Sequence, residues 1–337
     1  MKNLKLFILL MISINLSTSC GKPTTPEDVV PEDNSGGYKI VSRFQVNGYA
    51  QDVVKKDDLA YIAQGEGGLM IVNIADPTNP QSIASVSEGV RGYSSNIAIK
   101  DSVVYIAAGS FGVTVVNVAD SEKPEVTASN LSMKPAKSLH VMGDYLFTAI
   151  SEQGVKIASI SYATQPDPRS GISTSGYAHG IANTADSNYL LVACGEMGLS
   201  IFNISFFDDG FGNYPLIGWC DTPGYAESVT VMNDKSIAFL ACGTAGLQII
   251  DFSDSTNVHI VGSYDGSGYA KELIYNNNRI YMTTETAGFQ AIDVSDFTNP
   301  TLIGSIDTEF ALGLEMDDNY IYVADEDEGL IIISKPD

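Results

Sequence analysis

Gly48-Tyr49-Ala50 is the first copy of a phrase that recurs along this chain and decides its fold. The other copies, two of them degenerate, are Gly92-Tyr93-Ser94, Pro135-Ala136, Gly176-Tyr177-Ala178, Gly224-Tyr225-Ala226, Gly268-Tyr269-Ala270 and Phe310-Ala311. From Tyr49 to Phe310 the chain advances 261 residues in six steps, a mean of 43.5 residues per step. That period is typical of a four-stranded propeller blade, so the seven copies predict a seven-bladed β-propeller.

Each repeat divides into four short apolar or β-branched runs. In the first copy these are 53–54, 59–63, 69–74 and 83–86, and the turns between them are rich in Gly, Asp, Asn and Pro. Runs of this length between such turns predict strands, and none is long enough to be a helix. The sequence therefore predicts an all-β protein.

Glycine and proline mark fixed points of the repeat. A glycine opens the third run in every copy, where we expect a tight turn with positive φ. These glycines are Gly68, Gly112, Gly154, Gly198, Gly246, Gly288 and Gly329. Five copies carry a proline at the start of the fourth run, namely Pro80, Pro124, Pro168, Pro215 and Pro300. Because proline cannot donate to a β-ladder, the fourth strand is predicted to be the outer edge of its blade.

The two ends of the repeat array complement each other. The last copy stops after its third run, 330–334, whereas a spare run, 38–44, precedes the first copy and resembles 302–306. We expect this N-terminal strand to complete the seventh blade and close the ring, so that residues 38–337 form one propeller domain.

The segment from the third to the fourth strand resembles the LVIVD repeat family, which is named for the string at its third strand. Segments 69–80 and 289–300 match best, whereas 161–170 and 205–215 depart from the pattern. The resemblance implies a secreted or cell-surface propeller of bacteria or archaea, in a family mostly without an assigned activity. It supports fold and location and leaves function open.

The first residues resemble an export signal. Lys2 and Lys5 flank the start, and the apolar run 6–12 is too short to span a bilayer. Small residues then precede Cys20, as in the lipobox of bacterial lipoproteins, although Ser17 stands where that motif usually has leucine. We predict a signal peptide over 1–19, with ordinary secretion as the alternative to lipidation.

Cys20 is the predicted lipidation site. The Pro-, Thr- and acid-rich stretch 20–37 that begins with it predicts a disordered tether. We therefore expect an exported protein of the cell envelope, held at the bacterial outer membrane or cell surface by its lipid alone.

The charge of the chain restricts its partners. The formal net charge is −23, and loss of residues 1–19 with Lys2 and Lys5 makes it −25. Such a field repels phosphate backbones and anionic lipid surfaces, so we expect no nucleic-acid partner.

The phrase itself lies on the propeller face where the loops into each inner strand surround the central channel. Its aromatic residues are Tyr49, Tyr93, Tyr177, Tyr225, Tyr269 and Phe310. They either pack between neighbouring blades or form a stacking platform for a sugar or a peptide.

The residue directly after the phrase varies between blades. The seven residues are Gln51, Ser95, Lys137, His179, Glu227, Lys271 and Leu312. An asymmetric ligand requires such variation around a ring, although drift at exposed positions produces the same pattern. We place the candidate ligand site at this channel mouth, with Lys137, His179, Glu227 and Lys271 as its polar residues.

Carboxylates occur in five turns between the second and third strands of the same face. They are Glu66, Glu152, Glu196, Glu285 and Asp327. Converging carboxylates attract cations, which makes them weak candidates for Ca²⁺ ligands, with solvated surface charge as the alternative. We expect no other cofactor.

Motifs for catalysis are scarce. His140, His179 and His259 occupy different repeat positions, so neither a metal triad nor a Ser-His-Asp arrangement is indicated. The three cysteines after Cys20 have no spacing typical of disulfide frameworks or zinc sites. We therefore expect a non-catalytic protein that binds a protein or polysaccharide of the envelope. The alternative is a carbohydrate-active hydrolase or lyase that uses channel-mouth carboxylates such as Glu66, Glu152 and Glu196.

Overall fold

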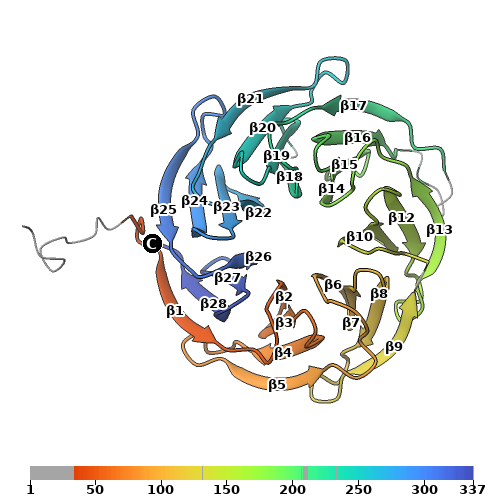
Figure 1. Ribbon diagram of the computed structural model, residues 1–337, viewed down its shortest axis with the longest axis vertical. Helices are drawn as coiled ribbons and strands as arrows, with labels where there is room; N and C mark the ends of the chain where they lie inside the picture. The colour runs from red at the N-terminus through yellow and green to blue at the C-terminus, as the bar shows by residue number, and fades with distance from the viewer. Residues whose placement is uncertain (1–33, 131, 206, 208–211, 233, 337) are drawn as a thin grey trace, which may run out of the picture. The chain divides into compact units, whose positions relative to one another are not determined.

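The computed structural model describes residues 34–130, 132–205, 207, 212–232 and 234–336. Within these ranges, 28 strands form seven four-stranded antiparallel sheets arranged as blades around a central channel (Figure 1). The fold is the predicted seven-bladed, all-β propeller. The described part of the chain contains no helix long and apolar enough to cross a membrane. The predicted signal peptide, Cys20 and most of the tether lie outside the described residues.

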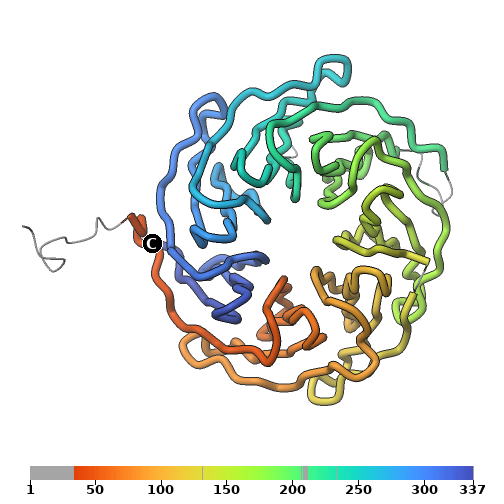
Figure 2. Tube along the Cα trace, viewed as in Figure 1, coloured from red at the N-terminus to blue at the C-terminus, as the bar shows by residue number. Residues whose placement is uncertain are grey.

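Each blade runs from an inner strand at the channel to an outer strand at the rim (Figure 2). In the order of blades one to seven, the inner strands are β2 (Asp52–Lys56), β6 (Asn96–Lys100), β10 (Ser138–Met142), β14 (Ile181–Asn183), β18 (Ser228–Met232), β22 (Ala270–Asn276) and β26 (Ala311–Met316). The second strands are β3 (Leu59–Ala63), β7 (Val103–Ala107), β11 (Tyr145–Ala149), β15 (Tyr189–Ala193), β19 (Ile237–Ala241), β23 (Arg279–Thr284) and β27 (Tyr320–Asp325). The third strands are β4 (Leu69–Asn73), β8 (Val113–Asn117), β12 (Val155–Ser159), β16 (Leu199–Asn203), β20 (Leu247–Asp251), β24 (Gly288–Asp293) and β28 (Gly329–Ser334). The outer strands are β5 (Gln81–Val86), β9 (Glu125–Asn130), β13 (Asp167–Ile172), β17 (Leu216–Cys220), β21 (His259–Tyr264), β25 (Thr301–Ile306) and β1 (Lys39–Phe44).

The ring closes as the sequence predicts. β1 pairs antiparallel with β28, from Lys39 opposite Ser334 to Phe44 opposite Leu330, and supplies the missing outer strand of blade seven. The predicted edge prolines also lie on outer strands or directly before them. Both ends of the propeller therefore meet in one sheet.

The third strand is apolar on both faces because a neighbouring blade covers each face. Leu69 and Ile71 pack in a cluster shared with blade two, whereas Met70 and Val72 pack in a cluster shared with blade seven. All four side chains are buried. A strand that is covered on both faces has a continuous run of apolar residues instead of an alternating pattern. This explains the uninterrupted apolar run at the third strand of each repeat.

Neighbouring blades are joined by a backbone contact that we call the interblade bridge. Gly65, in the turn between β3 and β4, donates to the Ser94 carbonyl at 3.1 Å and accepts from the Ser94 N–H at 3.0 Å. In the described residues the bridge recurs with both hydrogen bonds as Gly195 with Ala226. It recurs with the phrase N–H donating to the turn carbonyl as Gly109 with Ala136, Ser151 with Ala178 and Gly243 with Ala270. The turn residue has positive φ in each case, 54° at Gly65 and 58° at Ser151. The third residue of the recurring phrase is therefore the partner of the preceding blade.

The glycine that opens the third strand provides a test of the closure. Gly329 has a φ of 81°, and a Cβ atom there would lie 2.3 Å from the carbonyl oxygen of Phe44 in β1. Gly143 also has positive φ, 57°, but a Cβ atom would meet nothing within 4 Å. Gly143→Ala should therefore cost only the backbone penalty of about 1–2 kcal/mol. Gly329→Ala should lower the free energy of unfolding further, because β1 must also shift.

Urea denaturation of the two variants beside the unchanged protein measures this difference. Equal losses in Gly329→Ala and Gly143→Ala would show that β1 does not pack against the glycine as described.

Candidate functional site

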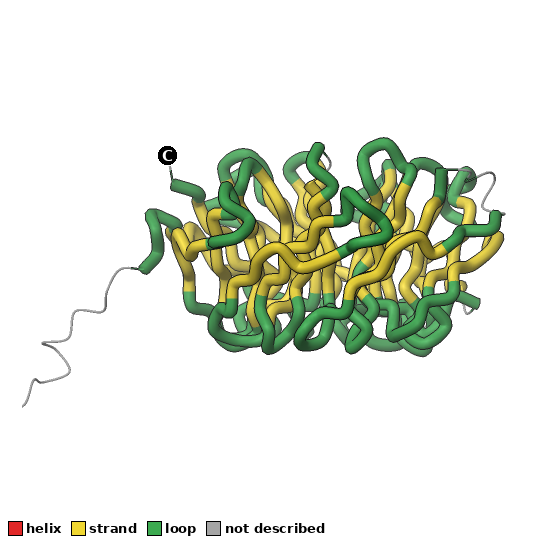
Figure 3. Tube along the Cα trace, turned by 90° about the horizontal axis from the view of Figure 1, so that it is seen from above, coloured by secondary structure: helices red, strands yellow, loops and turns green. Residues whose placement is uncertain are grey.

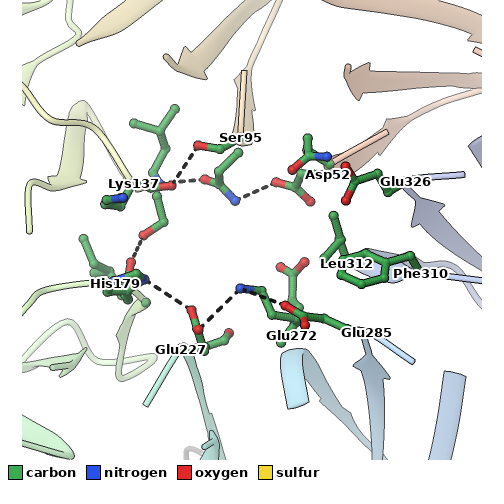
Figure 4. A pocket seen from close by; sticks show the side chains of 18 residues that line it. Asp52, Ser95, Lys137, His179, Glu227, Glu272, Glu285, Phe310, Leu312 and Glu326 are labelled. Carbon is green, nitrogen blue, oxygen red and sulfur yellow. Dashed lines mark hydrogen bonds and ion pairs between the residues drawn. The ribbon is translucent and has the colours of Figure 1, made fainter. Parts of the chain in front are cut away.

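A cavity of about 430 Å³ lies at the mouth of the central channel (Figure 4). It opens among the starts of the inner strands and the turns between second and third strands. Loops lie on both faces of the propeller, with the strands between them (Figure 3). All seven residues that directly follow the recurring phrase line it. They are Gln51, Ser95, Lys137, His179, Glu227, Lys271 and Leu312. The structure thus brings the predicted ring together in one cavity, and whether that cavity binds a ligand stays a prediction.

The aromatic residues of the phrase take a different position. Among the six predicted at the site, only Phe310 lines the cavity. The rings of Tyr93, Tyr225 and Tyr269 lie over the bridge glycine of the preceding blade, where an added Cβ atom would approach them to 2.7–2.9 Å. This placement fits the packing interpretation. Tyr49, Tyr93 and Tyr177 nevertheless remain 39–51% exposed at the rim.

Glu227 is the centre of an ion-pair network inside the cavity. Its carboxylate lies 3.3 Å from His179 Nδ1 and 3.4 Å from Lys271 Nζ, and it accepts a hydrogen bond from Tyr269 at 2.8 Å. Lys271 also lies 3.7 Å from Glu285. Burial raises the pKa of Glu227, but the His179 hydrogen bond and the Lys271 charge outweigh it and lower the pKa to about 2. Glu227 is therefore ionised at neutral pH.

His179 also connects the network to the rim. Its Nε2 atom lies 3.0 Å from the Tyr225 hydroxyl, while Nδ1 faces Glu227. Each ring nitrogen of His179 therefore has one partner from blade five, and Tyr225 and Glu227 together orient the imidazole.

Polar side chains below this ring join neighbouring inner strands, a feature that the sequence analysis missed. Asp52 accepts hydrogen bonds from the Asn96 amide at 2.6 Å and from the Ile97 N–H at 2.9 Å, both in blade two. Glu272 likewise accepts from the Leu314 N–H of blade seven at 3.0 Å. Burial raises the pKa of Asp52 to about 7 and raises that of Glu272 well above its usual value. In the sequence, these residues could have been found as polar residues that directly follow a residue of the variable ring, as Asp52 follows Gln51 and Glu272 follows Lys271.

Blades six and seven depart from the repeat next to the cavity. Glu285 and Glu326 occupy the turn position that is Gly or Ser in the other five blades. Their N–H groups donate instead to the carbonyls of Tyr269 and Phe310 at 3.0 and 2.9 Å, within their own blades. Both glutamate side chains line the cavity. Glu326 was absent from the predicted site, although a glutamate at a glycine position was visible in the sequence.

The inner strands of these two blades are also bulged. In the described chain, the pairing of an inner strand with its second strand shifts register only in β22 with β23, between Ala270 and Leu273, and in β26 with β27, between Ala311 and Gly313. Lys271 and Glu272 lie in the first bulge and Leu312 in the second. Bulges redirect side chains and are frequent next to functional sites.

Thr283 connects the two bulges. Its hydroxyl accepts from the Glu272 N–H at 3.2 Å and donates to the Leu312 carbonyl at 2.6 Å, and the side chain is fully buried. The other six blades carry alanine at this position, namely Ala63, Ala107, Ala149, Ala193, Ala241 and Ala324. A single threonine in an alanine column was therefore the signal for the bulges.

The five candidate calcium ligands lie on five separate turns. Glu66, Glu152, Glu196 and Asp327 are exposed on separate turns and do not line the cavity. Glu285 does, because it stands one position earlier in its turn. Among the described residues, no group of three or more His, Cys, Asp or Glu side chains is placed to hold a metal ion.

His140 and the three cysteines after Cys20 have structural surroundings. His140 lies 2.6 Å from Asn183 in the inner strand of blade four. Cys194, Cys220 and Cys242 are buried free thiols.

Thr283 can be tested by substitution. Thr283→Ala restores the residue of the other blades but leaves the Leu312 carbonyl and the Glu272 N–H without their partner, at a cost of about 1–3 kcal/mol in the free energy of unfolding. Thr283→Ser keeps the hydroxyl and should stay close to the unchanged protein. Urea denaturation compares the two, and equal stability of Ala and Ser variants would show that the hydroxyl does not hold the bulges.

Comparisons with known proteins agree with this architecture. The LVIVD repeat family model matches residues 47–87, 223–266, 267–308 and 311–335. A search of curated proteins found no match to the sequence. Among solved structures, the computationally designed Ika8 protein is similar, with a TM-score of 0.60 at 11% identity over 85% of this chain and 83% of that chain. At that identity the likeness shows the fold alone. The four matches fall in blades one, five, six and seven of the propeller described above. A β-propeller with LVIVD-type repeats suggests a binding or interaction protein.

Proposed function

We propose that this chain is a non-catalytic lipoprotein of the cell envelope, acylated at Cys20, whose propeller binds a protein or polysaccharide partner through the channel-mouth cavity. The observation that carries the proposal is the cavity itself, lined by a different residue from each of the seven blades. A symmetric scaffold that presents an asymmetric lining is suited to recognise one face of one partner.

The first residues of the sequence support the proposed location. An apolar run that is too short to span a bilayer, followed by small residues and Cys20, is typical of an exported and lipidated protein. A net charge of −23 keeps such a propeller away from anionic lipid surfaces. Its cavity would thus face soluble or wall-bound partners.

The carbohydrate-active alternative has less support. Glu66, Glu152 and Glu196 lie exposed on three separate turns outside the cavity. Inside it, Asp52 has both oxygens engaged by donors from Val53, Asn96 and Ile97. Glu227 is likewise surrounded by three partners. Asp52 and Glu227 thus hold neighbouring blades together rather than stand ready to transfer a proton to a substrate.

Affinity capture tests the proposal. The purified protein is incubated with envelope extract from its own source beside two double variants, and bound proteins and glycans are identified by mass spectrometry. Lys137→Met with His179→Gln alters the cavity. Glu122→Gln with Lys123→Met makes changes of the same kind on the exposed turn between β8 and β9, at the opposite face.

We expect one partner to be recovered by the unchanged protein and by the opposite-face variant. Its recovery should fall at least about tenfold with the cavity variant, since polar side chains that a partner desolvates on binding can carry much of the binding energy. Equal recovery by all three proteins would place binding elsewhere. A polysaccharide recovered in shortened form would contradict the non-catalytic role.

A further inference from the structure

Charge is unevenly distributed around the channel-mouth cavity. Lys137 and His179, from blades three and four, lie on one side, and Asp52 and Glu326 lie opposite them (Figure 4). Glu272, from blade six, completes the acidic side. The cavity is therefore bipolar.

Part of this charge is already neutralised within the protein. Lys271 lies between Glu227 and Glu285, at 3.4 and 3.7 Å, and His179 and Tyr269 complete the shell of Glu227. A ligand that displaced these contacts would lose as much as it gained. Recognition must therefore use the polar groups that the network leaves over.

Four charged or amide side chains of the lining have unused polar groups. Within the described residues, the Lys137 ammonium and the Glu326 carboxylate have no ion pair or hydrogen bond, and Glu272 uses only Oε2, to accept from Leu314. The Gln51 amide nitrogen is buried without an acceptor in that same part of the chain. The lining thus offers an unpaired cation, two acceptors of positive charge and an unused N–H donor.

Apolar surface lies beside the acidic groups. Phe310 and Leu312, both from blade seven, line the cavity near Glu326 (Figure 4). The volume of about 430 Å³ falls in the range of small-molecule sites. A ligand with a short apolar side chain would fit this sector.

From this placement we infer that the cavity binds a zwitterionic amine, an amino acid or a short peptide with free amino and carboxyl groups. The ammonium pairs with Glu272 and Glu326, the carboxylate pairs with Lys137, and a peptide carbonyl accepts from Gln51. The inference rests on the proposed function, because it names the ligand class of the same cavity. Within that function it favours a peptide over a polysaccharide, since a neutral glycan leaves both charges unpaired and an acidic glycan meets five carboxyl groups.

The acidic side links this binding to pH. Burial raises the pKa of Glu272, and Asp52 and Glu315 raise it further, while Lys271 and the Leu314 N–H act against them. Protonation of Glu272 removes the anion that holds the ammonium, so affinity should fall as the pH is lowered. An α-amino group stays mostly charged up to pH 7, which separates its own titration from this effect.

Isothermal titration calorimetry of the purified protein with three probes tests the inference. The probes are the dipeptide alanylphenylalanine, its N-acetyl derivative and its C-terminal amide, each measured at pH 5.5 and pH 7.0. We expect the dipeptide to bind at pH 7.0 at least about tenfold more tightly than either blocked form, since each blocked form loses a charge-assisted contact. Dipeptide binding should weaken at pH 5.5, and binding of the N-acetyl form should not.

Variants assign the two ends of the ligand. Glu272→Gln keeps an oxygen to accept from Leu314, and Glu326→Gln alters a carboxylate that holds no other side chain, so at least one of them should fold normally. Both should weaken the dipeptide and the amide but not the N-acetyl form. Lys137→Met should weaken the dipeptide and the N-acetyl form but not the amide. Glu196→Gln, an exposed turn carboxylate outside the cavity, is the matched control.

Equal binding of the three probes, or unchanged binding in all three cavity variants, would overturn the inference. So would no binding of the dipeptide at millimolar concentration. If the dipeptide does not bind but capture of an envelope partner is still lost with Lys137→Met and His179→Gln, the ligand class is wrong and the proposed function stands. If capture is also unaffected by those changes, both are wrong.

Discussion

The interblade bridge is the interaction on which the rest of the propeller depends. One or two backbone hydrogen bonds join the turn of one blade to the third residue of the phrase that opens the next, and the turn residue of each bridge has positive φ. The same contact also fixes the direction in which each residue of the phrase points. The small third residue is buried, the tyrosine covers the turn glycine, and the residue that comes next points into the channel mouth. A single backbone contact thus places both the packing residues and the variable lining.

Blades six and seven show what happens where this bridge is given up. Glu285 and Glu326 replace the turn glycine, the inner strands bulge, and Thr283 fills the space between the bulges. The result is an acidic half of the cavity, where desolvation raises the pKa values of Glu272 and Glu326. Carboxyl groups held in this way oppose the packing of the ring, because burial disfavours their charged forms. The blades that depart from the repeat therefore also carry the carboxyl groups that lower the stability of the propeller, and both features lie at the cavity.

Much of this architecture was predictable from the sequence because the repeat reports it locally. The blade number, the positive-φ glycines such as Gly68, the outer-edge prolines and the closing strand 38–44 all follow from one period and its end effects. The variable ring at the channel mouth was predictable for the same reason, since its position relative to the phrase is fixed.

What could not be predicted depends on contacts between blades. The pairing of Glu227 with His179 and Lys271 joins residues more than 40 positions apart, and no local pattern encodes it. Asp52 was overlooked because a polar residue at the start of a strand is usually solvated, whereas here the next blade covers it. The calcium hypothesis treated five turn carboxylates as equivalent, although Glu285 stands one position away from the others in its turn.

The pairing of β1 with β28 also constrains the order in which the molecule is made. Lys39 lies opposite Ser334, so the earliest strand of the propeller has no partner until almost the whole chain has been synthesised. A contact of such high sequence separation forms late and slowly. Until then blade one has an open neighbour, and the apolar groups that later fill the seam between blades seven and one are accessible to water and to other chains. A chain that ends before β28 therefore cannot close the ring, because β1 then has no strand to pair with.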